Sequence, residues 1–236
     1  MEQMDVWLES FWASIVETFS YVWVLMPSLL QGLRITVTLF AITLVCSVPL
    51  GLPVALGSMS KIKPIRWLSR VYVWLFRGTP LILQLYFFYF FIPIATGVKL
   101  DSFPTAAITF VLNYAAYLSE IYRAGIQSID RGQYEAAQSL GLSPRRTMFG
   151  IIIPQTIKRV LPPVSNEAIT LVKDTALVSV IGVADLMKNS RGAVNRDVDA
   201  MAYLIAALIY LAFTFLLTLL VTRLERKFSQ HEIRGE

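Results

Sequence analysis

Acidic side chains stand inside an otherwise apolar stretch of the chain, residues 163–183. Glu167, Thr170 and Asp174 are spaced by three and four residues, which places them on one face of a helix. A carboxylate at the centre of a bilayer costs about 2.5 to 3.5 kcal/mol, so this face is expected to look into protein or a water-filled cavity. Asn113, in another apolar stretch, could be part of the same site, because carboxylates and an amide can together bind a cationic group.

The same carboxylates could instead be structural. Lys173 adjoins Asp174, and Glu120 lies three residues before Arg123. Each acid could therefore belong to an ion pair that fixes helix packing or a gate. We interpret Lys173 as a structural or gating residue.

Most other side-chain chemistry is absent. The chain has one Cys, Cys46, within an apolar stretch, and one His, His231, in the polar tail. A disulfide framework, a His-rich metal site and a buried Ser-His-Asp triad are thereby excluded. The sequence also has no Gly-Lys dipeptide, so it lacks a phosphate-binding loop, and we expect no metal or cofactor on this chain.

The composition indicates a membrane protein. Of 236 residues, 56% are hydrophobic and 16% charged, and the mean hydropathy is +0.59, which excludes a soluble enzyme. Apolar stretches have the length of about 20 residues that a helix needs to cross a bilayer. They predict an all-α polytopic membrane protein with five transmembrane helices, at residues 33–57, 71–96, 103–122, 163–183 and 200–222.

Basic residues fall mainly on one side of these helices. Fifteen of the 21 Lys and Arg lie between helices 1 and 2, between helices 3 and 4, or after helix 5, when Arg77 near the start of helix 2 is counted with the first segment. Five lie on the other side: Arg34, Lys99, Lys188, Arg191 and Arg196. Because cytoplasmic loops are rich in Lys and Arg, we expect the N-terminus outside and the C-terminus in the cytoplasm. The net charge of +5 then reflects topology and contact with anionic lipid, and no nucleic-acid partner is expected.

The chain ends differ from the membrane domain. Residues 1–30 are acidic and rich in aromatic residues without a basic start, which excludes a signal peptide and favours an amphipathic helix in the outer interface. A sixth span is the alternative. The membrane domain is expected at 31–223, with a cytoplasmic loop at about 124–162, and a cytoplasmic tail at 224–236.

A break is expected near the start of the second helix. There Arg77-Gly78-Thr79-Pro80 interrupts the apolar pattern, and proline lacks the amide donor that a helix interior needs. We assign Arg77, like Lys173, a gating or structural role.

The loop at 124–162 is longer than usual connections between helices. Gly132 opens a helical pattern, and Gly141 occupies a position where a left-handed cap is needed. Ser143 and Pro144 then suit the N-cap and first residue of a further helix. The pattern predicts two short helices that meet at Gly141.

The loop resembles the signature of ABC importer permeases, Glu-Ala-Ala-x3-Gly-x9-Ile-x-Leu-Pro. The matching residues are Glu135, Ala136, Ala137, Gly141, Ile151, Ile153 and Pro154. Ile153 replaces Leu, which conserves volume, and Pro154 is expected to keep its helix-ending role. Two more stretches, at 77–81 and 173–180, resemble the polar amino-acid subfamily that serves histidine, glutamine and arginine. Together the three motifs and the order of the spans cover most of residues 30–222.

The resemblance implies a type I importer subunit of the bacterial inner membrane. Two permease chains, identical or different, would form the pathway for a polar L-amino acid, which an extracytoplasmic solute-binding protein or domain delivers. ATP-Mg would be bound by a pair of cytoplasmic ATP-binding subunits. Glu135, Ala136, Ala137 and Gly141 would couple to that ATPase, and the small alanines would allow its close approach.

The substrate site implied by the resemblance is at Asn113, Glu167 and Asp174. An acidic face repels glutamate and aspartate, so a neutral or cationic amino acid is expected. Three alternatives stay open. The loop could be a membrane-surface helix pair without a partner. The chain could be a secondary transporter or channel using Glu167 and Asp174 as ion or proton sites, although it lacks the internal repeats usual in that class. It could also be a membrane-bound enzyme, although its loop has no His or Cys nucleophile.

Overall fold

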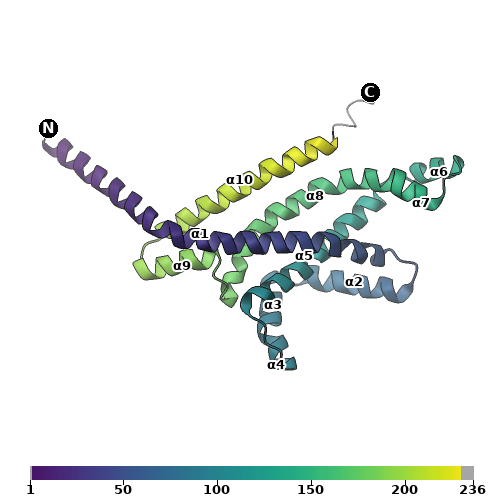
Figure 1. The fold of residues 1–236 in the computed structure, drawn as a ribbon, viewed down its shortest axis with the longest axis horizontal. Coiled ribbons are helices and arrows are strands. Elements are labelled where there is room, and N and C mark those ends of the chain that lie inside the picture. Colours follow the sequence, from purple (N-terminus) through teal and green to yellow (C-terminus); the bar gives the residue numbers. More distant parts are fainter. Residues whose placement is uncertain (1, 230–236) are drawn as a thin grey trace.

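The computed structural model describes the backbone of residues 2–229 and the side chains of residues 16–227. Every regular element in this range is a helix, which confirms the all-α prediction (Figure 1). His231 and the end of the expected tail lie outside the described residues.

The longest element is α1, Glu2–Ser58, which runs along the length of the molecule (Figure 1). It is continuous across residue 30, where we expected an interfacial segment to end, so no loop separates that segment from the first apolar stretch. Helix α1 packs against α5, Ser102–Gln127. A Cβ atom on Gly51 would lie 3.1 Å from Leu118 Cβ and 3.2 Å from the Ala115 carbonyl oxygen, so this glycine permits the close approach.

The predicted break in the second apolar stretch is confirmed. Helix α2, Lys63–Gly78, and the helical run from Leu81 to Thr96 meet at an angle of 106°. That run consists of α3, Leu81–Tyr86, a π-helical turn, Phe87–Phe91, and α4, Ile92–Thr96. It points away from the long helices (Figure 1).

The cytoplasmic loop contains the two predicted short helices. They are α6, Arg131–Ser139, and α7, Pro144–Thr147. A π-helical turn, Met148–Ile152, then leads directly into α8, Ile153–Asp174. The expected helix-ending role of Pro154 is wrong. The Ile153 N–H donates five residues back, to the Met148 carbonyl, and this wider turn precedes the proline, which occupies the first turn of α8, where no amide donor is needed.

The fourth predicted helix, 163–183, is only partly α-helical. Helix α8 starts earlier, passes through Pro162 and Pro163, and ends at Asp174. A 3₁₀ helix, Thr175–Ile181, follows and ends at Gly182 in the left-handed conformation. Helix α10, Met201–Ser229, matches the last predicted span and extends past it.

A helix that the sequence analysis did not predict, α9, Leu186–Asp197, joins the last two segments. Asp185 caps it by accepting hydrogen bonds from the Met187 and Lys188 amides. At its other end, the Tyr21 hydroxyl of α1 donates to Asp197 Oδ2 over 2.8 Å. Hydrogen bonds from the adjacent Arg196 guanidinium and then from Tyr21 lower the pKa of Asp197 to about 2, so this carboxylate stays charged at physiological pH.

Two apolar clusters hold the helices together. The larger joins α1, α3, α5, α8 and the 3₁₀ helix through fully buried side chains such as Leu39, Leu85, Phe110 and Leu171. The smaller joins α1, α9 and α10. Outside these clusters large apolar side chains are exposed, as expected of helices that face lipid.

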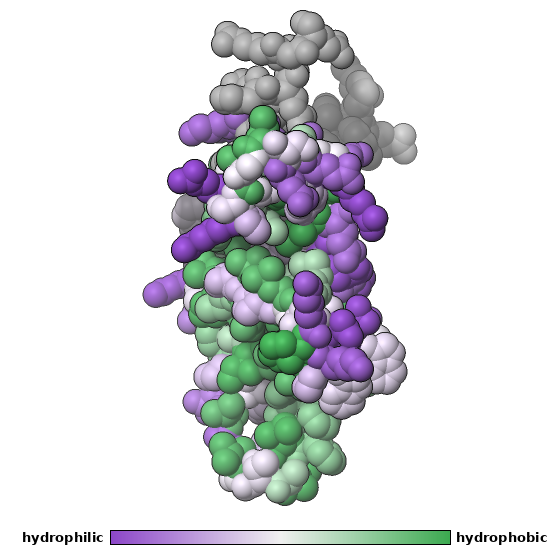
Figure 2. Space-filling model, turned by 90° about the vertical axis from the view of Figure 1, so that its right-hand side faces the viewer, coloured by the Kyte–Doolittle hydropathy of each residue, from purple (hydrophilic) through white to green (hydrophobic). Residues whose placement is uncertain are grey.

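Hydrophilic and hydrophobic surfaces are separated. Looking onto the end that carries α6 and α7, Figure 2 shows hydrophilic side chains in the upper and right-hand parts and hydrophobic ones at the lower end, where α3 and α4 lie. By length and composition, Val16–Ser58 and Met201–Lys227 could each cross a membrane, and the bent pair Lys63–Gly78 and Leu81–Thr96 could form a third span. The count of five spans and their orientation stay predictions.

Candidate functional site

The acidic face of α8 is present as predicted from the spacing. Glu167 and Asp174 are both partly buried and interact electrostatically with each other, whereas Thr170 between them is exposed. Two carboxylates of like charge repel each other in a low-dielectric site. A cation bound beside either carboxylate would reduce this repulsion.

Tyr114 completes this acidic pair, and the sequence analysis missed it. Its hydroxyl donates to Asp174 Oδ2 over 2.8 Å, and its side chain is only 4% exposed. The bond joins α5 to the end of α8 and fixes one carboxylate oxygen. A tyrosine in an apolar stretch is not distinctive, but its position next to Asn113 was an available signal.

Asn113 has partners other than the acidic pair. Its amide nitrogen donates to the Phe76 carbonyl over 3.2 Å and to Gln84 Oε1 over 3.0 Å. Among the described residues no hydrogen bond joins Asn113 to Glu167 or Asp174. Its amide nitrogen therefore supports the break between α2 and α3, and its expected role in substrate binding stays a prediction.

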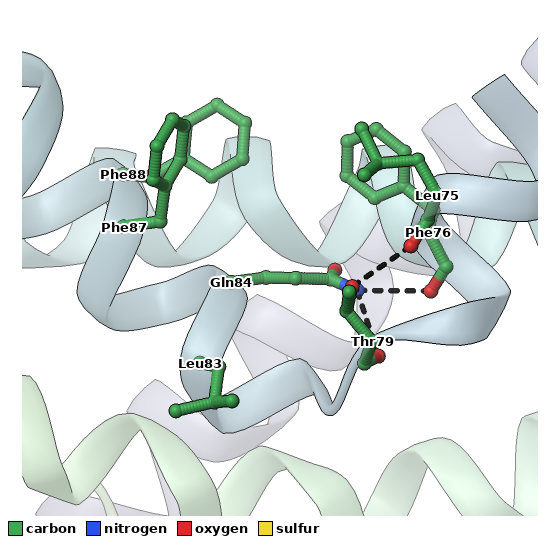
Figure 3. A pocket seen from close by; sticks show the side chains of 7 residues that line it. All are labelled: Leu75, Phe76, Thr79, Leu83, Gln84, Phe87 and Phe88. Atoms are coloured by element: carbon green, nitrogen blue, oxygen red, sulfur yellow. Dashed lines mark hydrogen bonds between the residues drawn. The ribbon is translucent and has the colours of Figure 1, made fainter. Parts of the chain in front are cut away.

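Gln84 is the centre of that break (Figure 3). Its amide nitrogen donates to the Phe76 carbonyl, the Thr79 carbonyl and the Thr79 hydroxyl at 2.8 to 3.0 Å. These contacts satisfy carbonyl groups that the interrupted helix leaves without partners. A mostly apolar cavity of about 310 Å³ adjoins it, lined by Leu75, Phe76, Thr79, Leu83, Gln84, Phe87 and Phe88. Nothing in the sequence pattern around Gln84 distinguishes it as a functional residue.

Arg77 lies in the last turn of α2, directly before the break. Its guanidinium lies 5.2 Å from the centre of the Tyr117 ring and 3.6 Å from Glu120 Oε2. Glu120 is held more tightly by Arg123, through two bonds of 3.0 and 2.6 Å, which confirms the ion pair considered from the sequence. Arg77 also interacts electrostatically with Glu167.

Lys173 is exposed and interacts electrostatically with Asp174. Among the described residues it forms no salt bridge. Groups of three or more His, Cys, Asp or Glu that could hold a metal ion are also absent from the described part of the chain.

The two short loop helices form a rigid corner. The Asp130 side chain accepts from the Gly132 amide at the start of α6. At its end the Gly141 and Leu142 amides donate to the Gln138 and Ala137 carbonyls, and Gly141 has a φ of 70°. This is the Schellman arrangement, which favours glycine at the left-handed position.

The signature residues of the loop do not all face outward. Glu135, Ala136 and Gly141 are exposed, whereas Ala137 is 1% exposed. Neighbouring residues on a helix point about 100° apart, and here Ala136 lies at the surface while Ala137 is buried within the protein. The expectation that both alanines are open to another protein is therefore corrected for Ala137. Leu140 and Phe149, 78% and 65% exposed, add apolar contact area.

Comparison with known proteins adds an independent line of evidence. Residues 47–230 match the family described as "Binding-protein-dependent transport system inner membrane component". The L-cystine transport system permease protein of Bacillus subtilis is 42% identical over 207 residues, covering 87% of this chain and 88% of the relative. The arginine transport system permease protein of the same organism is 39% identical, covering 87% and 94%.

Solved structures agree with these matches. The crystal structure of an amino acid ABC transporter with histidines contains a chain that is 37% identical, with a TM-score of 0.82, covering 90% of this chain and 97% of that one. The MetNI methionine ABC transporter in an inward-facing conformation matches at 17% identity with a TM-score of 0.68, covering 89% and 98%. The second likeness concerns the fold alone.

Proposed function

Because the chain belongs to the family of binding-protein-dependent transport system inner membrane components, we propose that Glu167 and Asp174 form its substrate-binding face. The protein is a permease subunit of an amino-acid ABC importer in the bacterial inner membrane. It is a transport component, and the secondary transporter considered from the sequence is disfavoured. The proposal concerns which amino acid it carries and how.

The substrate is a polar L-amino acid that is neutral or cationic, with a preference for cationic. The observation that carries this is the pair of partly buried carboxylates, Glu167 and Asp174, held on α8 opposite Tyr114. Such a pair attracts an ammonium or guanidinium group through charge-assisted hydrogen bonds and repels an acidic side chain. Relatives named for cystine and arginine transport fit this range, and Asn113 on α5 would be a further contact.

Lys173 and Arg77 would have a gating or structural role at this site. Lys173 interacts with Asp174, and Arg77 with Glu167. Each basic side chain would respond to a change of charge at its carboxylate, which is the basis for assigning both a gating or structural role.

The partners follow from the importer class. We propose two permease chains, a pair of cytoplasmic ATP-binding subunits that hold ATP-Mg, and an extracytoplasmic solute-binding protein. The rigid corner of α6 and α7 would dock on the ATPase through Glu135, Ala136 and the turn at Gly141. If the five predicted spans have the N-terminus outside, this corner would lie on the basic, cytoplasmic side.

Direct binding tests the substrate proposal. Radiolabelled L-arginine, L-glutamine and L-glutamate are titrated onto the purified permease–ATPase complex without the solute-binding protein. Glu167→Gln should weaken L-arginine about tenfold, the effect of losing one charge-assisted contact, and change L-glutamine far less. Glu225→Gln, the same change at the end of α10, is the control. Equal arginine affinity in the wild type and Glu167→Gln would return Glu167 to a structural role.

A further inference from the structure

Helices α1 and α9 enclose a cavity of about 300 Å³. The wall from α1 is mostly apolar and includes Val24, Leu25 and Leu29, whereas the wall from α9 carries the basic residues Lys188 and Arg196. Helix α9 packs against α1 along this stretch (Figure 1). The cavity therefore combines two cationic side chains with an apolar surface.

Two hydrogen bonds fix the helices around this cavity. The Asn189 amide nitrogen donates to the Ser28 carbonyl over 2.8 Å, and both residues line the cavity. The Tyr21 hydroxyl donates to Asp197 at the other end of α9. The shape of the cavity is thus set by the packing of two helices and does not depend on a loop.

Lys188 and Arg196 can act on one anion. They are eight residues apart, about 12 Å along the helix axis, and they lie on the same face of α9 with Gly192 between them. A Cβ atom on Gly192 would meet nothing within 4 Å, so the space over this glycine is open. Both basic side chains are long enough to reach into it.

Both cations keep donors for a ligand. Lys188 Nζ donates to the Gly182 carbonyl, and an ammonium group has three donors. Arg196 uses Nε and Nη2 to hold the adjacent Asp197, which does not line the cavity. Lys188 forms no salt bridge within the described part of the chain. A bound anion would therefore gain charge-assisted hydrogen bonds from both side chains.

The cavity lies where lipid headgroups are expected. Helix α9 is polar and joins the apolar 3₁₀ helix to the apolar α10, so it is expected at one end of the spans. On α1, Phe19 and Trp23 are 72% and 81% exposed just before the cavity-lining Val24, and tryptophan is enriched at the membrane–water interface. A lipid at this level can place its phosphate on α9 and its acyl chains along α1.

We propose that this cavity binds the phosphate of an anionic phospholipid. Lys188 and Arg196 hold the phosphate, and the apolar wall of α1 accepts the start of the acyl chains. The two cations repel an amino group in the headgroup, so a headgroup with a net negative charge is preferred. A carboxylate of a protein partner would pair with the cations but leave the apolar wall uncovered, which favours the lipid.

Lipid binding to the purified permease–ATPase complex in mild detergent tests the proposal. Dioctanoyl phosphatidylglycerol is titrated, and bound lipid is counted by native mass spectrometry. Lys188→Gln should weaken binding about tenfold, the effect of losing one charge-assisted contact, and Lys188→Arg should keep it. Arg191→Gln is the matched control, because Arg191 is exposed on the same helix but does not line the cavity.

A second comparison uses the wild-type complex and needs no variant to fold. Phosphatidylglycerol should bind more tightly than phosphatidylcholine of the same chain length. The free headgroup, glycerophosphoglycerol, should not displace it, because that molecule lacks the acyl chains.

Three results overturn the lipid site. The first is an equal affinity for the two lipids, and the second is displacement by the free headgroup, which would indicate an anion site without a lipid. The third is the same phosphatidylglycerol affinity in Lys188→Gln and Arg191→Gln. If Lys188→Gln instead weakened binding of the solute-binding protein and left lipid binding unchanged, the cavity would be a protein-docking surface.

Discussion

Asp174 is oriented by Tyr114, and in the proposed substrate site this contact would limit how the carboxylate meets a cation. With Oδ2 accepting from the tyrosine hydroxyl at 2.8 Å, the remaining oxygen is left for a substrate or for Lys173. A fixed carboxylate binds a cation more tightly than a free one, because less conformational entropy is lost on binding. The bond also connects the two helices that carry the candidate site.

Replacing Tyr114 by Phe removes only the hydroxyl. We expect L-arginine affinity for the purified complex to fall about five- to tenfold, the effect of one hydrogen bond to a charged group. Tyr122→Phe is the matched control, because it removes from the same helix a hydroxyl that donates to the Val48 carbonyl. Equal affinities in the two variants would show that Tyr114 does not orient the site.

At this scale the sequence predicted the acidic residues better than their partners. Glu167 and Asp174 stood out because carboxylates are costly in an apolar span. Tyr114 and Gln84 did not, because tyrosine and glutamine are tolerated in many settings and only the packing of α5 and α3 brings them to their partners. Asn113 does make buried polar contacts, but its partners are Phe76 and Gln84 at the break between α2 and α3.

Helices α1 and α9 meet at a close-packed junction that a single glycine permits. A Cβ atom on Gly32 would lie 2.8 Å from the Asp185 carbonyl oxygen and from Leu186 Cα. These are backbone atoms at the start of α9, where the Leu186 amide donates to Thr36 of α1. Helix α1 therefore cannot accept a side chain at residue 32 without moving α9.

Gly32→Ala should lower the free energy of unfolding by about 1 to 3 kcal/mol, as overpacking does. Thermal unfolding of the detergent-solubilised complex measures this as a lower midpoint. The control is Gly192→Ala in α9, where a Cβ meets nothing within 4 Å and alanine favours the helix. A midpoint that is the same in both variants would mean that α1 and α9 pack more loosely than described.

The loop helices give a second test at the scale of elements. Glu135→Arg reverses an exposed charge on α6, so it should reduce the ATPase that copurifies with the permease by at least about tenfold. The permease should still reach the membrane at its normal level. Glu225→Arg is the control. Normal ATPase recovery in Glu135→Arg would remove the coupling role from α6.

The sequence predicted turns and helix breaks correctly where a glycine, serine or proline determines the backbone conformation. Gly141, Ser143 and Pro144 gave the corner between α6 and α7, and Pro80 gave the break after α2. The prediction that Pro154 ends a helix was wrong, because the π-helical turn before it allows the helix to continue. Helix α9 was missed because it is short and polar, and its stability comes from the Asp185 cap and from contacts with α1 and α10 rather than from an apolar pattern.

The whole molecule is a set of long helices with the corner of α6 and α7 at one end (Figure 1), and on the face that Figure 2 shows, hydrophilic and hydrophobic surfaces are separated. Most of its apolar surface can be covered only by lipid or by partner chains. The fold class was predictable from hydropathy alone, since 56% of the residues are hydrophobic. The angle of 106° between α2 and the helical run after it and the length of α1 could not be predicted, because both depend on how the helices pack.

The most direct test of the account is tagged purification of the chain from its native membrane in mild detergent, followed by reconstitution into vesicles. The account predicts a stoichiometric ATPase subunit in the eluate and uptake of labelled L-arginine or L-glutamine only when ATP and a solute-binding protein are supplied on their proper sides. Elution of the chain alone, with amino-acid uptake driven by a proton gradient and no ATP hydrolysis, would contradict it.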